Sequence, residues 1–209
     1  MNNSKQILTT GLLLMLFAVI GSGLVGATFE GTKDQIAENE RRAMLRTLNN
    51  ILPAGTYDND LINESITLDR DNRLGQTETS TAYQAKKDGQ VTAVILPVIA
   101  PDGYSGAIKL LVGIRADGTL AGVRIVHHKE TPGLGDGIEI KRTDWVLGFN
   151  DKSLTNPDLH GWQVKRDGGQ FDQLTGATIT PRAIVKAVHQ SLVYFDRNKT
   201  RLLNRTADD

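Results

Sequence analysis

The chain of 209 residues contains no cysteine. A protein without thiolates forms no disulfide, attaches no c-type haem and holds no iron–sulfur cluster through cysteine ligands. Any redox group in this chain must therefore be organic, or a metal bound by histidine and carboxylate side chains alone.

The chain also lacks an excess of charge of either sign, and it is poor in aromatic residues. It has 24 basic and 24 acidic side chains, and aromatic residues make up 5% of the total. Proteins that bind nucleic acid usually present a basic patch or aromatic stacking surfaces. We therefore expect no nucleic-acid partner.

One long segment carries no charge at all. The 24 residues from Gln6 to Phe29 are uncharged, and as a helix they would span about 36 Å, enough for a hydrocarbon core of about 30 Å. A secretory signal peptide is the alternative, because Val25–Ala27 resembles a small-residue cleavage site. The apolar stretch is longer than the usual signal-peptide core of about 7–15 residues. We therefore predict a retained transmembrane anchor over residues 1–29.

A connecting helix is predicted to follow the anchor, over residues 30–55. Thr32 or Asp34 can cap its start, and Pro53 marks its end. The stretch from Tyr57 to Thr79 is polar and weakly periodic, which favours short strands and loops.

The middle of the chain alternates apolar and polar residues as β-strands do. Residues 82–86 and 91–99 flank a Lys-Asp-Gly turn, and residues 108–114 and 121–125 flank an Ala-Asp-Gly turn, so each pair predicts a hairpin. Pro97 indicates an edge or a bulge. Strands gathered before a C-terminal helix predict an α+β fold. We expect an antiparallel or mixed sheet with flanking helices, preceded by one N-terminal transmembrane helix.

Three smaller elements are predicted near the C-terminal half. Trp145–Phe149 has the spacing of a short helix, and Trp162–Lys165 that of a short strand. Residues 199–209 form a charged C-terminal tail that we expect to be frayed.

The residues from Asp172 to Pro181 form a turn of small residues that leads into a helix. Thr180 is a natural N-cap and Pro181 suits the first helical position. Apolar residues then recur at helical spacing from Ile184 to Phe195. The exposed N–H groups at such a helix start attract a phosphate, and a bound anion would explain Arg182, whose charge is otherwise unfavourable in a first turn.

Three segments resemble the signature sequences of the FMN-binding domain family. The quartet Thr175–Thr178, preceded by Asp172, resembles the family's flavinylation motif. The segments Pro101–Ala107 and Glu130–Asp136 resemble its two other signature loops. Together with the N-terminal anchor, they resemble the family of G subunits of Rnf (Rsx) ion-translocating electron transport complexes.

This resemblance implies a domain over residues 56–198 that carries FMN covalently, through a phosphoester on Thr178. Leu134 would pack against one face of the isoalloxazine ring, and Asp172 would belong to the sequence that a flavin transferase recognises. The residues implied in cofactor binding are Thr178, Thr175, Gly176, Ala177, Asp172, Tyr104, Ser105, Gly106, Glu130, Thr131, Leu134 and Gly135.

The resemblance also implies partners and a location. The chain would be an electron-carrying part of an ion-translocating oxidoreductase rather than a stand-alone catalyst, beside other Rnf subunits and matured by a flavin transferase. It would cross the inner (cytoplasmic) membrane once, with its FMN domain on the periplasmic side. The charges around the anchor do not decide this orientation, since Lys5 precedes it and Lys33, Arg41 and Arg42 follow it.

Two other functions fit parts of the pattern. A non-redox module at the membrane could hold an anionic ligand at the same helix start, and a hydrolase could use Ser105 with a histidine. Ser105 lacks the G-x-S-x-G context of a nucleophile elbow. The adjacent His127 and His128 face opposite sides of a strand, which disfavours a shared metal. The glycines from Gly133 to Gly137 lack the spacing of a dinucleotide fingerprint.

Overall fold

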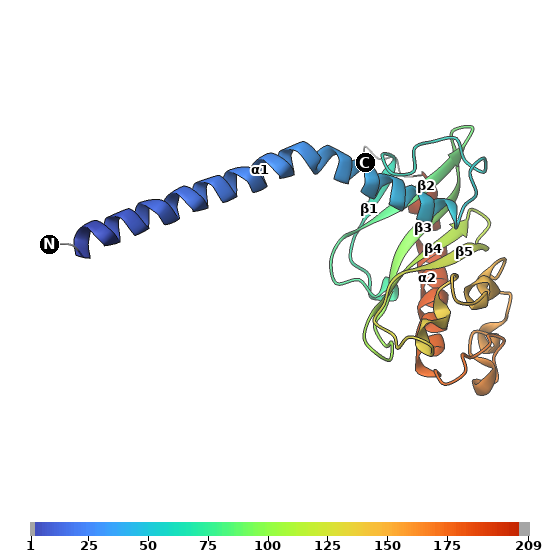
Figure 1. The fold of residues 1–209 in the computed structure, drawn as a ribbon. Coiled ribbons are helices and arrows are strands. Elements are labelled where there is room, and N and C mark those ends of the chain that lie inside the picture. The colour runs from blue at the N-terminus through green and yellow to red at the C-terminus, as the bar shows by residue number, and fades with distance from the viewer. Residues whose placement is uncertain (1–2, 205–209) are drawn as a thin grey trace. The chain divides into compact units, whose positions relative to one another are not determined.

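The computed structural model describes residues 3–204 (Figure 1). The chain divides into two compact units, Met1–Met44 and Leu45–Asp209. Residues 1–2 of the predicted anchor and residues 205–209 of the predicted tail lie outside the described residues.

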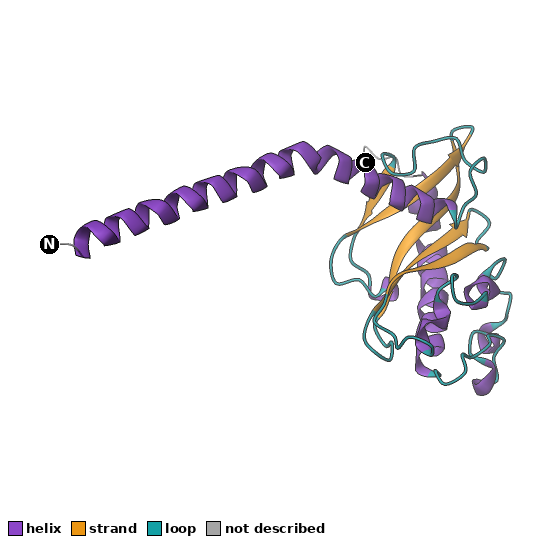
Figure 2. Ribbon diagram, in the orientation of Figure 1, coloured by secondary structure: helices purple, strands orange, loops and turns teal. Residues whose placement is uncertain are grey.

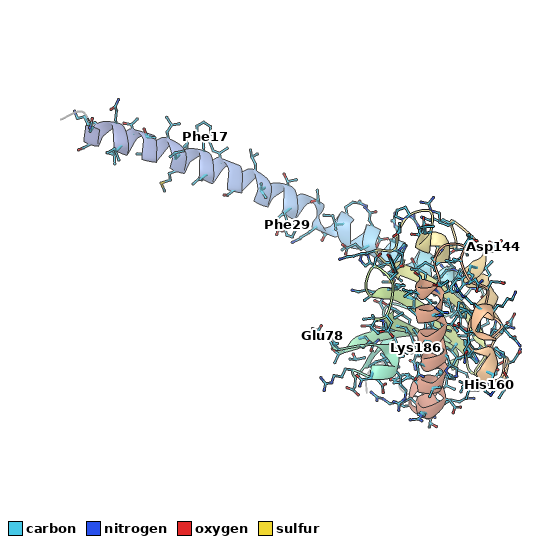
Figure 3. All side chains as sticks on the ribbon, turned by 90° about the horizontal axis from the view of Figure 1, so that it is seen from below. Phe17, Phe29, Glu78, Asp144, His160 and Lys186 are labelled. Atoms are coloured by element: carbon cyan, nitrogen blue, oxygen red, sulfur yellow. The ribbon has the colours of Figure 1, made fainter. Side chains whose placement is uncertain are left out.

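A single helix, α1 (Asn3–Asn49), contains the described part of the predicted anchor and most of the predicted connecting helix. Its most apolar part has a mean hydropathy of 2.2, and its length and composition suffice to cross a membrane. Large apolar side chains, Phe17 and Phe29 among them, project outward from it (Figure 3). A helix with apolar side chains on every side is suited to lipid rather than to water.

The predicted start of a second helix at Thr32 or Asp34 is wrong, because α1 runs through both positions. The hydroxyl of Thr32 donates to the carbonyl of Thr28, one turn earlier, at 2.8 Å. Threonine can make this bond inside a helix as readily as it caps one, so the residue type alone does not mark a helix start. α1 ends at Asn49, before Pro53.

The larger unit is built on a five-stranded sheet in the order β1-β2-β3-β4-β5. All neighbouring pairs are antiparallel, which confirms both predicted hairpins and the α+β fold. Asp88 and Gly89 turn the chain between the strands of the first hairpin with positive φ angles of 52° and 76°. The strands are β1 (Ser65–Leu68), β2 (Ser80–Lys87), β3 (Gln90–Ala100), β4 (Ile108–Arg115) and β5 (Leu120–His127).

Both faces of the sheet are covered by other parts of the chain. The C-terminal helix α2 (Ile179–Asn204) packs along one face (Figure 2), where Val112 and Ile184 are fully buried. On the opposite face, a Cβ on Gly113 would stand 2.3 Å from Cγ2 of Ile51, just after α1. Burial from two sides explains why β3 and β4 are apolar along almost their whole length.

Pro97 lies in the part of β3 that no longer pairs with β2. The ladder between β2 and β3 extends to Tyr83 and Ile95, whereas Pro97 pairs with Leu111 of β4. The carbonyl of Pro97 accepts a 2.6 Å hydrogen bond from the side-chain amide of Gln76 instead of a strand. The edge position predicted for this proline is therefore confirmed.

Two predictions for the C-terminal half are wrong. Residues 162–165 form no strand; Val164 makes an isolated bridge to Phe171, and the Trp162 ring packs against the Phe171 ring at an angle, with the ring centres 5.1 Å apart. Their alternating burial comes from an aromatic cluster that fills a loop region, not from a sheet. Residues 199–204 are not frayed but continue α2, because Leu202 is fully buried.

Candidate functional site

A cleft of about 360 Å³ lies where three segments far apart in the sequence come together. One segment carries Tyr104, the second follows β5, and the third leads into α2. The residues that line the cleft are Tyr104, Glu130, Thr131, Leu134, Gly135, Gly176, Ala177, Thr178, Ile179 and Thr180. The structure thus brings together residues from all three signature segments identified in the sequence.

The helix at the edge of the cleft begins earlier than predicted. α2 starts at Ile179, so Thr178 directly precedes it and the predicted N-cap, Thr180, lies inside its first turn. Thr180 is fully buried, and its hydroxyl donates to the carboxylate of Glu130 at 2.5 Å rather than to the helix backbone. The half-buried Thr178 is therefore the residue beside the first N–H groups of α2, which have no partner within the helix.

Glu130 joins the three segments. Its side chain is 4% exposed. One carboxylate oxygen accepts from the backbone N–H of Ser105 at 3.0 Å, and the other accepts from the hydroxyl of Thr180. Both oxygens are therefore occupied by protein donors, and the residue serves to hold the Tyr104 loop and the start of α2 against its own loop.

His128 holds Glu130 in turn, a role that the sequence did not indicate. Its Nδ1 accepts from the backbone N–H of Glu130 at 3.0 Å, and its Nε2 lies 2.7 Å from a carboxylate oxygen of Glu139. Since Nδ1 is the acceptor, the ring proton is on Nε2 and points at Glu139. With both nitrogens engaged, His128 has none left to activate Ser105 or to bind a metal.

Two glycines allow the walls of the cleft to approach each other. A Cβ on Gly135 would stand 2.9 Å from atoms of Glu130, and one on Gly176 would stand 2.8 Å from Cδ2 of Leu134. Gly176 also has a φ of +77°, which residues other than glycine rarely adopt. Leu134 and Tyr104 remain 46% and 68% exposed, so the mouth of the cleft presents apolar surface.

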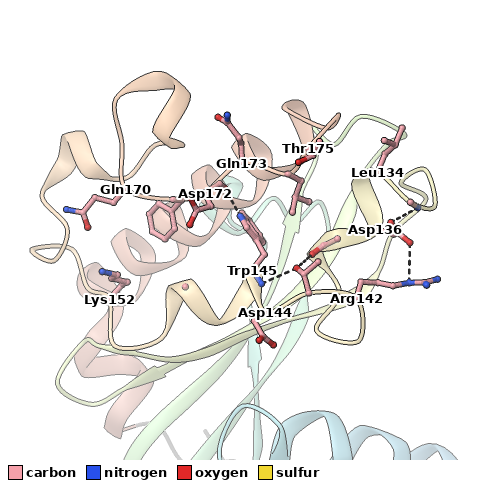
Figure 4. Close-up of a pocket in the computed structure, with 16 residues that line it drawn as sticks. Leu134, Asp136, Arg142, Asp144, Trp145, Lys152, Gln170, Asp172, Gln173 and Thr175 are labelled. Carbon is pink, nitrogen blue, oxygen red and sulfur yellow. Dashed lines mark hydrogen bonds and ion pairs between the residues drawn. The ribbon is translucent and has the colours of Figure 1, made fainter.

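Some predicted site residues lie outside this cleft. Asp172 and Thr175 line a second cavity of about 680 Å³, which shares Leu134 with the first (Figure 4). Among the described residues, Ser105 and Gly106 line neither cavity. Ser105 contributes its N–H to Glu130, and Gly106 turns the chain with a φ of 120°.

Arg182 is neutralised by the protein itself. Its guanidinium makes two hydrogen bonds of 2.6 Å to the carboxylate of Asp167, in a turn to which the sequence assigned no role. This hydrogen bonding and the opposite charge lower the pKa of Asp167 and raise that of Arg182. The expectation that Arg182 marks a bound anion is therefore wrong, because Asp167 supplies the negative charge.

Within residues 3–204, no group of three or more histidine, aspartate and glutamate side chains is arranged to hold a metal ion. The cleft instead offers side-chain hydroxyls, among them that of Thr178, which lies directly before the first N–H groups of α2 and beside the small residues Gly176 and Ala177.

Comparison with known proteins gives two family matches. Residues 103–193 match the FMN-binding domain, and residues 1–51 match the RnfG N-terminal region. The first match contains all the residues that line the cleft.

Relatives of the whole chain are named as G subunits of ion-translocating oxidoreductase complexes. The protein from Pseudomonas aeruginosa (strain UCBPP-PA14) is 52% identical, with 95% of this chain and 93% of that protein covered. The protein from Vibrio cholerae (strain M66-2) is 47% identical, with 93% of each covered. The protein from Pseudoalteromonas atlantica is 45% identical, with 96% and 94% covered.

A solved structure shares the fold. The crystal structure of the C subunit of Na(+)-translocating NADH-quinone reductase from Parabacteroides distasonis matches with a TM-score of 0.50 at 19% identity. The match covers 66% of this chain and 77% of that one. On the sequence identity over nearly its whole length, the chain belongs to the family of G subunits of ion-translocating oxidoreductase complexes and contains an FMN-binding domain.

Proposed function

We propose that the chain relays electrons through FMN bound covalently, by a phosphoester, to the hydroxyl of Thr178. It does so as one component of a membrane-bound ion-translocating oxidoreductase, the assembly for which its relatives are named. The observation that carries the proposal is the cleft itself, in which Thr178 lies beside the Tyr104 loop and the loop that contains Glu130 and Leu134.

The residues of the cleft suit a phosphorylated flavin. The first N–H groups of α2, next to Thr178, favour a phosphate through hydrogen bonding and the helix dipole. The small residues Gly176 and Ala177 leave room around the phosphate. The exposed apolar surface of Leu134 and Tyr104 is suited to pack against a flat aromatic ring and to shield that ring from water. The cleft volume of about 360 Å³ lies in the range typical of ligand sites, about 300–1,000 Å³.

The protein's task in this proposal is to bind, orient and shield. Bound FMN supplies the electron-carrying chemistry. Thr178 fixes the phosphate end, while Leu134, Thr131 and Gly135 line the space for the remainder. Glu130 keeps these walls together without needing to touch the cofactor, since its oxygens bond Ser105 and Thr180.

We further propose a single-pass location in the inner membrane, with the FMN domain on the periplasmic side. α1 supplies the apolar length. A covalent tether suits a compartment where a lost flavin is not easily replaced. The partners are then the other subunits of the Rnf complex, and a flavin transferase that installs FMN during maturation.

The two alternatives have less support. A module that holds a free anion reversibly would gain affinity from a cation beside the helix start, and Arg182 is already paired with Asp167. A hydrolase built on Ser105 would need a histidine, and both ring nitrogens of His128 are engaged elsewhere.

The proposal is tested by producing the chain with and without a flavin transferase and measuring its intact mass and its flavin fluorescence after denaturation. We expect covalent FMN on the wild-type chain and its complete loss in Thr178→Val, with an unchanged melting temperature. Thr79→Val is the matched control, because Thr79 is an exposed loop threonine that lines neither cavity. Covalent flavin that persists in Thr178→Val would refute the assignment.

A further inference from the structure

Asp172 lies at the start of the turn that leads to Thr178, and two other residues hold it in place. The indole N–H of Trp145 donates to its backbone carbonyl at 2.6 Å (Figure 4). The ammonium of Lys165 donates to its carboxylate at 2.5 Å. The side chain of Asp172 is nevertheless 68% exposed, so a fixed carboxylate faces the solvent.

Both residues that hold Asp172 are themselves anchored in the domain. Trp145 begins a short 3-10 helix, packs edge-on against Phe149 at 5.3 Å, and donates its backbone N–H to the hydroxyl of Thr143 at 3.1 Å. Lys165 donates its backbone N–H to the carbonyl of Phe171 at 2.7 Å. The position of Asp172 is therefore tied to the aromatic cluster rather than left to a flexible loop.

The turn between Asp172 and Thr178 is also closed in its middle. The N–H of Ala177 donates to the carbonyl of Leu174 at 3.1 Å. The side chain of Leu174 is half-buried against the core, near enough to Gly137 that a Cβ there would stand 3.1 Å from it. With its start clamped and its middle packed, the turn presents Asp172 and Thr178 in one defined spacing.

The stability of the domain does not account for the ion pair between Lys165 and Asp172. Ion pairs between exposed side chains usually contribute little to stability, and Lys165 and Asp172 are 58% and 68% exposed. A defined position for an exposed carboxylate is useful where another protein must recognise it.

We infer that Trp145 and Lys165 are positioning residues for FMN attachment: they fix Asp172 so that the enzyme that transfers FMN recognises its carboxylate. The inference rests on the proposed attachment to Thr178. In that transfer, a bond forms between the Thr178 hydroxyl oxygen and the flavin phosphate. The phosphoanhydride bond of a flavin dinucleotide donor breaks, the nucleoside monophosphate leaves, and the hydroxyl proton passes to the transferase.

The test measures initial rates of flavin transfer to the purified full-length chain, over a range of its concentrations, with a flavin transferase and flavin dinucleotide. Trp145→Phe keeps an aromatic ring but removes the indole N–H, and Lys165→Met keeps an unbranched apolar chain but removes the ammonium with its charge and its hydrogen bond. For each variant we expect kcat/KM to fall by about tenfold, the effect of about one lost hydrogen bond, chiefly through a higher KM for the chain. We expect melting temperatures to stay unchanged and Lys165→Arg to restore the rate.

Lys86→Met is the matched control for Lys165→Met, because the Lys86 ammonium also donates to a carboxylate, that of Glu64 at 2.7 Å, in another part of the domain. Its transfer rate should equal that of the wild type. Wild-type rates in Trp145→Phe and Lys165→Met, or an equal fall in Lys86→Met, would overturn the inference while leaving the attachment to Thr178 intact. If Trp145→Phe folds poorly, the inference is decided by the transfer rate of Lys165→Met, since the side chain of Lys165 is 58% exposed. A wild-type chain that accepts no flavin on Thr178 would overturn the proposed function, and this inference with it.

Discussion

The sheet and the cleft of the larger unit are held together in different ways. In the sheet, each strand is fixed by a ladder of backbone hydrogen bonds and by side chains such as Val112 and Ile114 that are fully buried. The cleft walls are loops. A few side chains fix them, above all Glu130, which bonds residues 25 and 50 positions away in the sequence.

This difference determines how each region responds to a substitution. Many residues share the stability of the sheet, so one change there weakens the whole unit without altering the site. The cleft depends on single polar contacts between loops, so one change there can disturb the site while the sheet remains folded. Substitutions that separate stability from flavin binding therefore test the comparison.

The largest effect on stability is expected from Ile114→Ala in β4. The side chain of Ile114 is fully buried, and truncation of such a residue costs about 2–5 kcal/mol. The melting temperature should fall by roughly 5–20 °C, whereas the folded fraction should still accept flavin on Thr178. Val126→Ala is the control, because Val126 is 53% exposed on the neighbouring strand. Loss of flavin attachment in proportion to the loss of stability would contradict the separation of the two regions.

A smaller effect, confined to the cleft, is expected from Glu130→Ala. It leaves the buried hydroxyl of Thr180 without its acceptor, at a cost of about 1–3 kcal/mol for an unsatisfied buried group. Hydrogen exchange should accelerate in the Tyr104 loop and at the start of α2, but not in β3 or β4. Glu130→Gln, which keeps an acceptor oxygen, should lie between the variant and the wild type. Equal acceleration in the sheet strands would show that Glu130 supports the whole unit.

A third variant, Gly176→Ala, probes how closely the loops approach. The positive φ of Gly176 makes any side chain unfavourable by about 1–2 kcal/mol, and the new methyl group would displace Leu134. Gly118→Ala is the matched control, with a φ of +95° and nothing within 4 Å of the new Cβ. Both variants should melt lower by similar amounts, but only Gly176→Ala should alter the flavin absorbance spectrum. The same spectral change in both would remove the argument for a specific contact.

The sheet was predictable because its determinants are periodic. Three of these determinants follow from local chemistry and are present in the structure. They are the alternation of apolar residues along β4 and β5, a turn sequence that contains glycine, and a proline in a part of a strand that lacks one neighbour. The three signature segments could be recognised as belonging together. Their distances from each other could not, since no local pattern encodes the bonds of Glu130.

Three of the errors arose where a side chain serves a distant partner. Thr180 has the chemistry of an N-cap, but its hydroxyl is used by Glu130, and the helix starts one residue before it. Arg182 suggested a bound anion, but Asp167 supplies that charge from a turn 15 residues earlier in the chain. Trp162 and Val164 alternate like a strand, but they fill an aromatic cluster. In each case a tertiary contact determines the role of a residue whose local pattern allows several.

The smallest effect on stability is expected from Leu134→Ala, at the mouth of the cleft. Complete burial of a leucine is worth about 1.5–3 kcal/mol, and Leu134 is 46% exposed, so its truncation should cost about 1 kcal/mol or less. Flavin should still attach, because Thr178 and its turn are unchanged. Since Leu134 lines both cavities, its loss should open the bound ring to water, which would shift the flavin potential and increase quenching of its fluorescence by iodide. Leu159→Ala is the control, because Leu159 is 68% exposed, begins a separate 3-10 helix and lines neither cavity. If quenching and potential in Leu134→Ala match those of the control, the ring does not lie against Leu134, and its site must be sought elsewhere along the walls of the two cavities.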